Sequence, residues 1–503
     1  MAFQPFFTGA AAALLAVAWP LAQCADFIPQ ADGPANRPNV ILIMSDDQGW
    51  GDAGFMGHPV MQTPHLDGLA ASGTVFTRFY AAAPVCSPTR ASVLTGRHPK
   101  RMGIDNPNTG ELRHEEVTLA EIARDLGYVT AHFGKWHLGT MTSDVQDSNR
   151  GAPGNVAEYS PPWEHGYDIV FATEAKVPTF DPMVNPDNHA EWFGAAYWTG
   201  PGQAVPYADT SLMGDDSRVL IDRIVPFIEN MVTNDRRFFT TVWLHAPHDP
   251  VVADPSDDTY AGHEGLTDDQ RTFYTIITQM DRQIGRLMET LAKQGILENT
   301  LIAFTSDNGP SHVFAGSAGG LRGFKQDLYE GGVRVPSILS WPGVIPSGQR
   351  KNTPTITHDY LPTLLEIWEV DGKAWLGDRP LDGRSMMPIF RGEETPVRDL
   401  AFGFSRYNAT RESDLPQRMS LIRGNDKIIT HDFGDTWALY DLEADSSEQN
   451  DLASQLPDKV EAMKARWNAW FASTLSSRAG ADYRKLAGTC LNFRLISTGC
   501  WET

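Results

Sequence analysis

A cysteine followed at short intervals by a proline and an arginine is the most chemically suggestive stretch of the chain. In the segment CSPTR, Cys86 precedes Pro88 and Arg90. Proline suits the first helical turn, so the spacing predicts a helix that begins near Cys86 and carries Arg90 on the same face. A helix N-terminus attracts anions, and the Arg90 guanidinium could hold Cys86 or a group made from it. The alternative is a buried, inert cysteine near a turn.

Two short apolar runs, at 39–44 and 300–305, each end in a pair of oxygen donors. These donors are Asp46, Asp47, Asp307 and Asn308. Ligand sites in open α/β sheets form beyond the carboxyl ends of the strands, so the pairs are expected to meet. Their oxygens suit a hard cation, Ca²⁺ or alternatively Mg²⁺, better than Zn²⁺. A turn or helix cap would explain one such pair, but two pairs favour a metal site.

Lysine and histidine side chains gather in the other polar segments of the chain. They are Lys135, His137, His245, His248 and Lys325. Lysines can neutralise an anionic substrate, and histidine is a natural proton donor near neutral pH. Taken singly, each could instead be a surface lysine or a histidine satisfied within a loop.

The elements that would position these residues alternate along the chain. Strands are expected at 39–44, 128–133, 238–244 and 300–305, and helices at 117–126, 217–231 and 267–294. This alternation predicts an α/β fold with a large, mostly parallel central sheet flanked by helices. The section 141–212 is rich in Pro, Gly, Asn and Trp and is expected to form surface loops around a cleft. Trp163, Trp192 and Trp198 could stack on sugars there, or they could be ordinary core and surface aromatics.

The pattern of predicted secondary structure changes near residue 398. Short strands at 419–423, 427–430 and 437–440, followed by a helix at 457–475, predict a smaller C-terminal α+β subdomain with an antiparallel sheet. We therefore expect a signal peptide at 1–25, a leader at 26–37, a catalytic domain at 38–397 and the subdomain at 398–503.

The segment CSPTR, followed by Leu94-Thr95-Gly96-Arg97, closely resembles the signature of formylglycine-dependent type I sulfatases, which belong to the alkaline phosphatase superfamily. In this family the cysteine is oxidised to formylglycine, whose hydrate is the nucleophile. The segments Gly331 to Pro336 and Leu439 to Asp445 also resemble the family. The resemblance extends from about residue 38 to about 450. It implies an alkaline-phosphatase-like fold, maturation by a formylglycine-generating enzyme, and hydrolysis of sulfate esters.

The resemblance also implies a role for each residue. Asp46, Asp47, Asp307, Asn308 and the formylglycine made from Cys86 would hold the metal. Arg90 and Lys135 would steady the formylglycine, while Lys135 and Lys325 would grip sulfate. His137 would be the base and His245 the acid beside the leaving oxygen. His248 is either a substrate contact or part of a structural turn.

The net charge of −22 over 503 residues argues against nucleic-acid binding. The apolar run at 10–18 is too short to span a bilayer and is typical of a signal peptide, so we expect an exported periplasmic or secreted protein. Lipid anchoring at Cys24 is the less favoured alternative. Cys490 and Cys500 could form a disulfide or remain free thiols. Asn408 begins a glycosylation sequon that matters only in a eukaryotic secretory host.

The substrate predicted from these features is a sulfated polysaccharide or oligosaccharide, which would make the protein a bacterial carbohydrate sulfatase. One alternative is an arylsulfatase of small esters. A second is a phosphoesterase or phosphonate hydrolase of the same superfamily, although Cys86 stands where those enzymes usually carry Thr or Ser. A third is an inactive protein that binds sulfated glycans.

Overall fold

The computed structural model describes residues 37–189, 191–406 and 415–483. An eight-stranded sheet forms its centre, in the order β10-β2-β9-β7-β1-β6-β4-β5. Its strands are β1 (Asn39–Ser45), β2 (Thr74–Phe76), β4 (Val129–Lys135), β5 (Ile169–Thr173), β6 (Phe238–Trp243), β7 (Thr300–Ser306), β9 (Ser337–Ser340) and β10 (Gln349–Lys351). The neighbours β7, β1, β6, β4 and β5 are parallel, and β9 runs antiparallel to both β7 and β2. The predicted mostly parallel sheet is confirmed.

Strand β1 lies in the middle of this sheet, between β6 and β7. Its successive side chains enter opposite cores: Val40 and Leu42 join one apolar cluster, and Ile41 and Ile43 join the other. A strand covered on both faces needs apolar residues at every position, which explains its unbroken apolar run.

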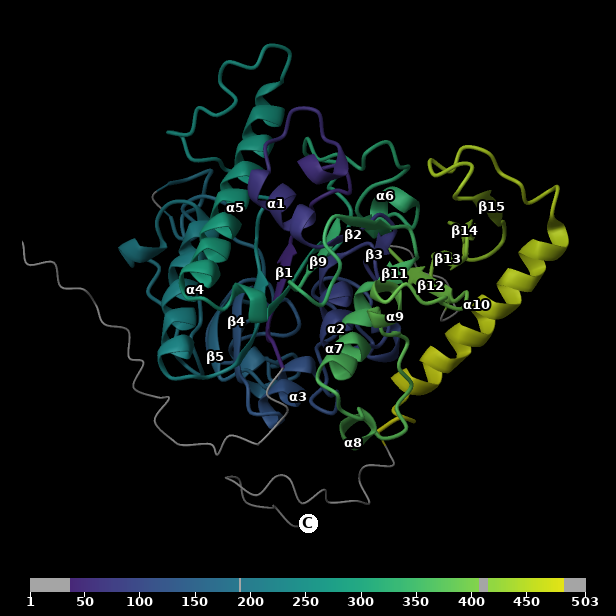
Figure 1. The fold of residues 1–503 in the computed structure, drawn as a ribbon, viewed down its shortest axis with the longest axis horizontal. Coiled ribbons are helices and arrows are strands. Elements are labelled where there is room, and N and C mark those ends of the chain that lie inside the picture. Colours follow the sequence, from purple (N-terminus) through teal and green to yellow (C-terminus); the bar gives the residue numbers. More distant parts are fainter. Residues whose placement is uncertain (1–36, 190, 407–414, 484–503) are drawn as a thin grey trace, which may run out of the picture.

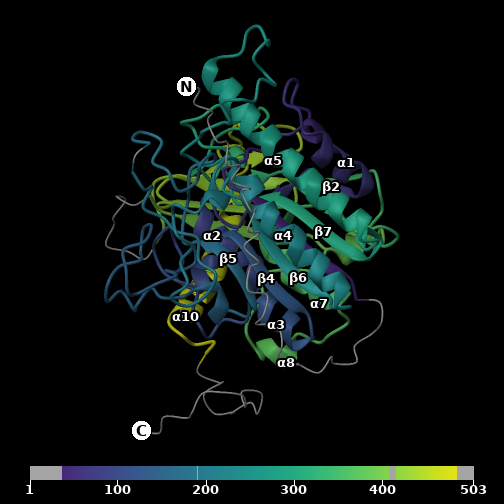
Figure 2. The same ribbon diagram turned by 90° about the vertical axis from the view of Figure 1, so that its left-hand side faces the viewer.

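Helices cover both faces of the sheet. The helices α1 (Pro64–Ser72), α4 (Asp216–Thr233) and α5 (Asp268–Lys293) lie on one face, and Figure 2 shows α4 and α5 lying across the strands. The other face carries α2 (Cys86–Thr95), α3 (Leu119–Asp125), α7 (Tyr360–Ile367), α8 (Lys373–Leu376) and α9 (Met387–Phe390). The three helices expected from periodicity are α3, α4 and α5, and each is confirmed to within about two residues. Helix α5 starts at a capping box in which Thr267 and Gln270 exchange hydrogen bonds, a reason for its sharp beginning.

The expectation that 141–212 forms only surface loops is wrong. Strand β5 lies within this section and forms an edge of the central sheet. Trp198 is 3% exposed and its indole N–H donates to Asp147, while Trp163 packs against the core. Trp198 therefore supplies no open stacking surface, whereas Trp163 is partly buried and Trp192 is 38% exposed. The strand is only five residues long and stands among loop-forming residues, so the local pattern concealed it.

A four-stranded antiparallel sheet follows in the chain, as predicted. Its strands are β12 (Asp399–Phe404), β13 (Arg418–Arg423), β14 (Asp426–Thr430) and β15 (Ala438–Asp441). Leu421 and Ile428 pack against helix α10 (Pro457–Arg478), whereas Ile422 and Ile429 face the rest of the protein. Figure 1 shows this sheet between the helix-covered central sheet and α10. We call this sheet, α10 and the segment that joins them the C-terminal subdomain; the boundary predicted at residue 398 stays a prediction.

A third, small sheet of β3 (Phe79–Tyr80), β8 (Arg334–Val335) and β11 (Thr355–Ile356) lies beside the short helix α6 (Glu330–Val333). Within the described ranges, no helix is long and apolar enough to cross a membrane. The expected signal peptide, Cys24, Asn408, Cys490 and Cys500 lie outside the described residues.

Candidate active site

Helix α2 begins at Cys86, where the sequence predicted a helix start. Val85 before it is extended, so the chain turns from an apolar segment directly into the helix. Cys86 is 1% exposed, and its Sγ lies 3.7 Å from Asp46 Oδ1. Burial raises the pKa of the Cys86 thiol to about 12. The unmodified residue is therefore a neutral thiol at neutral pH and a poor nucleophile.

The predicted oxygen donors meet because β1 and β7 are parallel neighbours. Ser45 pairs with Ser306, so the residues that follow both strands emerge at one rim of the sheet. The Asp47 backbone N–H donates to Asp307 Oδ1 at 3.1 Å, and the Asn308 amide N–H donates to Asp47 Oδ1 at 2.7 Å. Asp47 has a left-handed backbone, with φ of 64°, which turns the chain sharply after β1.

Three basic side chains interleave with these carboxylates. Lys135 ends β4, and its Nζ lies 2.6 Å from Asp46 Oδ2. Arg90 donates to Asp307 Oδ2 at 2.7 Å, and Lys325 Nζ lies 2.6 Å from Asp47 Oδ1. We call these six residues the active-site cluster: Asp46, Asp47, Asp307, Arg90, Lys135 and Lys325.

The charges shift the pKa values of the active-site cluster in opposite directions. Burial would raise the pKa of Asp46, but Lys135, His248 and Arg90 hold it well below its usual range. Burial and the nearby Asp46 carboxylate raise the pKa of Asp307 to about 7, although Arg90 opposes them. Burial would lower the pKa of Lys135, but Asp46, Cys86 and Asp307 together raise it. Crowded carboxylates of this kind would be stabilised by further positive charge.

The donor set fits a hard divalent cation. Asn308 Oδ1 is buried and has no hydrogen-bond partner among the described residues, which is costly unless a cation or water satisfies it. Asp46, Asp47, Cys86 and His248 also each offer an atom within 4.8 Å of one another. Three carboxylates balance three basic side chains in the active-site cluster, so a divalent cation would give the site a net positive charge suited to an anion.

All three predicted histidines follow the parallel strands β4 and β6 at this rim. His248 is neutral at neutral pH, because burial and Lys325 lower its pKa to about 4. Its Nδ1 bonds the Asp249 carbonyl at 2.7 Å, which leaves Nε2 to accept a hydrogen bond from Lys325 at 3.1 Å. His137 bonds Asn108 through Nε2 at 2.8 Å, and its buried Nδ1 has no partner in the described part of the chain. Burial, and secondarily Lys135, hold the pKa of His137 well below its usual range.

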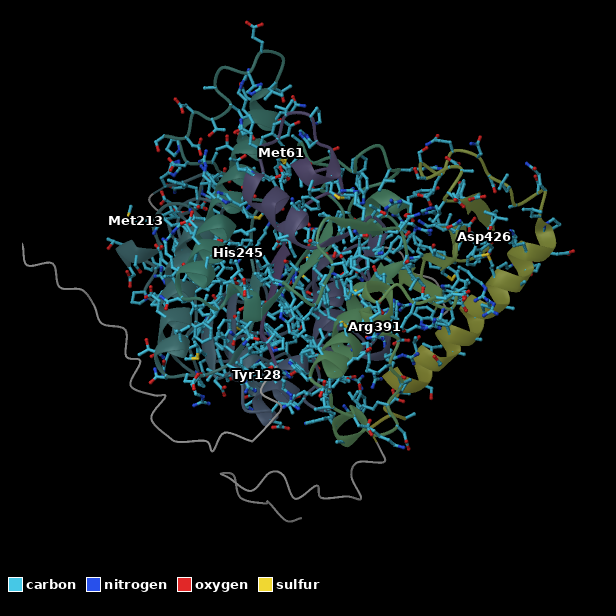
Figure 3. The ribbon with its side chains drawn as sticks, viewed as in Figure 1. Met61, Tyr128, Met213, His245, Arg391 and Asp426 are labelled. Atoms are coloured by element: carbon cyan, nitrogen blue, oxygen red, sulfur yellow. The ribbon has the colours of Figure 1, made fainter. Side chains whose placement is uncertain are left out.

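The third histidine, His245, is fully buried and both of its ring nitrogens are engaged. Nδ1 lies 2.7 Å from Asp216 Oδ2, and Nε2 lies 2.7 Å from Thr173 Oγ1. Asp216 is the first residue of α4, and Figure 3 shows His245 on the α4 side of the molecule. Its role as proton donor stays a prediction, since no described hydrogen bond links it to the active-site cluster.

Sequence reasoning did not identify the partners of these histidines. Asn108 and Asp216 stand 29 residues from His137 and His245 respectively, and no local spacing links either pair. The only local signal was Asp249, which directly follows His248.

Comparison with known proteins decides the family. The family described as Sulfatase matches residues 38–370, two thirds of the chain, including every residue of the active-site cluster. The chain belongs to the sulfatase family. It is a sulfuric ester hydrolase, and the family described as N-sulphoglucosamine sulphohydrolase, C-terminal, matches residues 322–469.

Relatives of this sulfatase act on different sulfate esters, as their names state. N-acetylgalactosamine-6-sulfatase of Canis lupus familiaris is 32% identical, over 74% of this chain and 69% of the relative. Arylsulfatase A of Homo sapiens is also 32% identical, over 74% of this chain and 71% of the relative. The structure of Ps i-CgsB in complex with k-i-k-neocarrahexaose shares the fold, with a TM-score of 0.73, 24% identity, and coverage of 90% of this chain and 98% of that chain.

Proposed function

We propose that this sulfatase removes sulfate from a sulfated polysaccharide or oligosaccharide, using a divalent cation and a formylglycine made from Cys86. The observation that supports the proposal most is the position of Cys86. It starts a helix, is buried, and lies 3.7 Å from Asp46 within a cluster of balanced charges. A thiol whose pKa is raised to about 12 is a poor nucleophile, so this position makes chemical sense for a residue that is converted before it acts.

Asp46, Asp47, Asp307 and Asn308 would hold the cation, together with the modified residue 86. Ca²⁺ is the expected ion and Mg²⁺ the alternative, because all four side chains offer oxygen atoms. When bound, the cation would neutralise sulfate oxygens and the charge that develops on them. The partnerless Asn308 Oδ1 supports this assignment.

The remaining residues would orient the reactants and move protons. Formylglycine, when present, supplies a hydrate of which one hydroxyl attacks sulfur while the other permits release of sulfate. Arg90 would keep residue 86 in place, and Lys135 and Lys325 would bind sulfate oxygens. His137 can accept a proton through Nδ1, because the lowered pKa keeps its ring neutral.

Protonation of the leaving oxygen would fall to His245. Its Nε2 is bonded to Thr173 in this structure, so the histidine must exchange that bond for one to substrate. His248 would contact substrate, because its Nε2 faces Lys325, which would bind sulfate.

The carbohydrate assignment draws on relatives named for sugar sulfates and on the oligosaccharide in the Ps i-CgsB structure. Arylsulfatase A and steryl-sulfatase are similarly close in sequence, so a small aromatic or steroid ester is the second candidate. Export, by a signal peptide in the first 25 residues, and maturation by a formylglycine-generating enzyme complete the proposal.

The deciding experiment measures inorganic sulfate released from sulfated polysaccharides, their oligosaccharides and an aryl sulfate. The protein is matured with a formylglycine-generating enzyme, and Cys86→Ala serves as the control. Release from one glycan that is absent in the control supports the proposal and names the sugar. Release from the aryl ester alone overturns the carbohydrate assignment. Release of phosphate from phosphate esters, or of the alcohol from phosphonate esters, without release of sulfate, would favour a phosphoesterase or phosphonate hydrolase.

A further inference from the structure

The loop that carries Lys325 is hydrogen-bonded to two segments of the active site, one near Asn308 and one near Cys86. We call residues 322–332 the Lys325 loop. The Lys325 backbone N–H donates to the Pro310 carbonyl at 2.9 Å, just beyond Asn308. The next residue, Gln326, donates its N–H to the Pro84 carbonyl at 2.8 Å, two residues before Cys86. Any displacement of this loop would therefore move Lys325 relative to both segments.

Gln326 has a left-handed backbone, with φ of 73°. This conformation is strained for a residue with a side chain, and it persists only where surrounding contacts hold it. On one side the holding contact is Pro84. On the other side Arg418, the first residue of β13, donates through Nη1 to the Gln326 carbonyl and to Asp327 Oδ1. Arg418 is 9% exposed and comes from the C-terminal subdomain.

The C-terminal subdomain also holds the far end of the Lys325 loop. The Glu330 backbone N–H donates to Glu448 Oε2 at 2.6 Å. Lys427 Nζ lies 3.0 Å from Glu330 Oε1 and 2.9 Å from Glu448 Oε1, and all three side chains are fully buried. We call Glu330, Lys427 and Glu448 the anchor cluster. At the near end, Arg322 donates to the Glu448 carbonyl at 2.8 Å.

From these contacts we propose that Arg418 is a positioning residue for Lys325. By holding the carbonyl of Gln326 it fixes the backbone directly after Lys325, whose Nζ then lies 2.6 Å from Asp47 Oδ1. The inference rests on the proposed role of Lys325 in sulfate binding. It makes the C-terminal subdomain part of the sulfate-binding apparatus, although that subdomain supplies no residue to the active-site cluster.

The kinetic test is a double-mutant cycle on matured protein with an aryl sulfate or the identified glycan. Lys325→Ala and Arg418→Ala are each expected to raise KM about tenfold while kcat stays within about threefold, the pattern of lost uniform binding. The double variant should be no worse than Lys325→Ala, because Arg418 acts through Lys325. If the increases in KM of the two single variants multiply in the double variant, the proposal is overturned. Arg423→Ala is the matched control, since Arg423 lies on the same strand and pairs with Asp399 near the surface.

Amide hydrogen exchange gives a readout that is independent of turnover. Exchange across 322–332 should be faster in Arg418→Ala and unchanged in Arg423→Ala; unchanged exchange in both variants overturns the proposal. Asp327→Asn, a milder change, should accelerate exchange less and guards against misfolding of Arg418→Ala. A normal KM in Lys325→Ala together with faster exchange in Arg418→Ala would overturn the sulfate-binding role of Lys325 but leave the anchoring intact.

Discussion

The active-site cluster and the anchor cluster are both buried and rich in charge, yet they have different structures. In the anchor cluster, Lys427 joins two carboxylates, and Tyr80 and Arg334 contact Glu330 from the other side. In the active-site cluster the basic groups also balance the carboxylates, but Asn308 Oδ1 beside the cluster lacks a partner in the described chain, and Cys86 lies alongside. Buried charge alone is thus a poor sign of catalysis. A buried oxygen atom without a hydrogen-bond partner, next to a cysteine that can be modified, is a better sign of catalysis.

The largest expected effect comes from removing the Cys86 side chain, which has no counterpart in the anchor cluster. Cys86→Ala should lower turnover by at least about a thousandfold, because it deletes the precursor of the nucleophile. The melting temperature should change little, since the salt links of the active-site cluster remain. Sulfate release and thermal unfolding, measured on the same samples, test this expectation; turnover within tenfold of the wild type would refute the mechanism.

The second prediction tests whether only the active-site cluster binds metal. Asp307→Asn removes a charged ligand while keeping its size, and it should reduce both the bound divalent metal and turnover about a hundredfold or more. Glu448→Gln makes the matched change in the anchor cluster and should leave the metal content unaltered. Elemental analysis of the purified variants measures both. Full metal content in Asp307→Asn would show that the ligands are wrongly assigned.

A third prediction concerns the stability that the anchor cluster provides. Lys427→Ala leaves Glu330 and Glu448 buried without their shared partner, so the free energy of unfolding should fall by about 3–5 kcal/mol. Lys459→Ala breaks an exposed pair with Asp426 and should cost less than about 1 kcal/mol. Urea unfolding of both variants gives the comparison. Equal losses would mean that the anchor cluster is no stronger than a surface pair.

The smallest expected effect is a pH dependence of the anchor cluster. Burial and the nearby Glu330 raise the pKa of Glu448 from 4.5 to about 7, in spite of Lys427. A raised carboxyl pKa means that the folded state binds more protons, so the contribution of Glu448 to stability falls as pH rises from about 4.5 to about 7. Glu448→Gln lacks this contribution. Its melting temperature relative to the wild type should therefore increase between pH 5 and pH 8; a constant difference would contradict the shifted pKa.

The sequence predicted the central architecture because its elements are governed by local patterns. The buried strand at 39–44 and the long amphipathic helix at 267–294 both carry strong periodic signals, and β1 and α5 confirm them. The positions of Asp47 and Asp307 followed from the topology, since strand ends in a parallel sheet share a rim. Strand β5 was missed because five residues among Pro and Gly carry too weak a pattern.

Long-range pairings could not be predicted in the same way. Arg418 contacts a backbone carbonyl 92 residues earlier in the chain, and Lys427 pairs with Glu330 across a separation of 97 residues. Such contacts depend on how the C-terminal sheet packs, and no local spacing encodes that packing. For the same reason Asp216 was not recognised as the partner of His245, although Asp216 begins a predicted helix and His245 follows a predicted strand.

The burial of Cys86 has a consequence for how this protein must be made. Every residue of α2 is enclosed once the chain has folded, so an oxidising enzyme has no route to the sulfur afterwards. The proposed modification of Cys86 must therefore take place before the chain folds around this cysteine. A molecule that folds before Cys86 is modified would be well ordered but inactive. The specific activity of a preparation would accordingly depend on the fraction of molecules modified before folding as much as on the turnover rate of the modified enzyme.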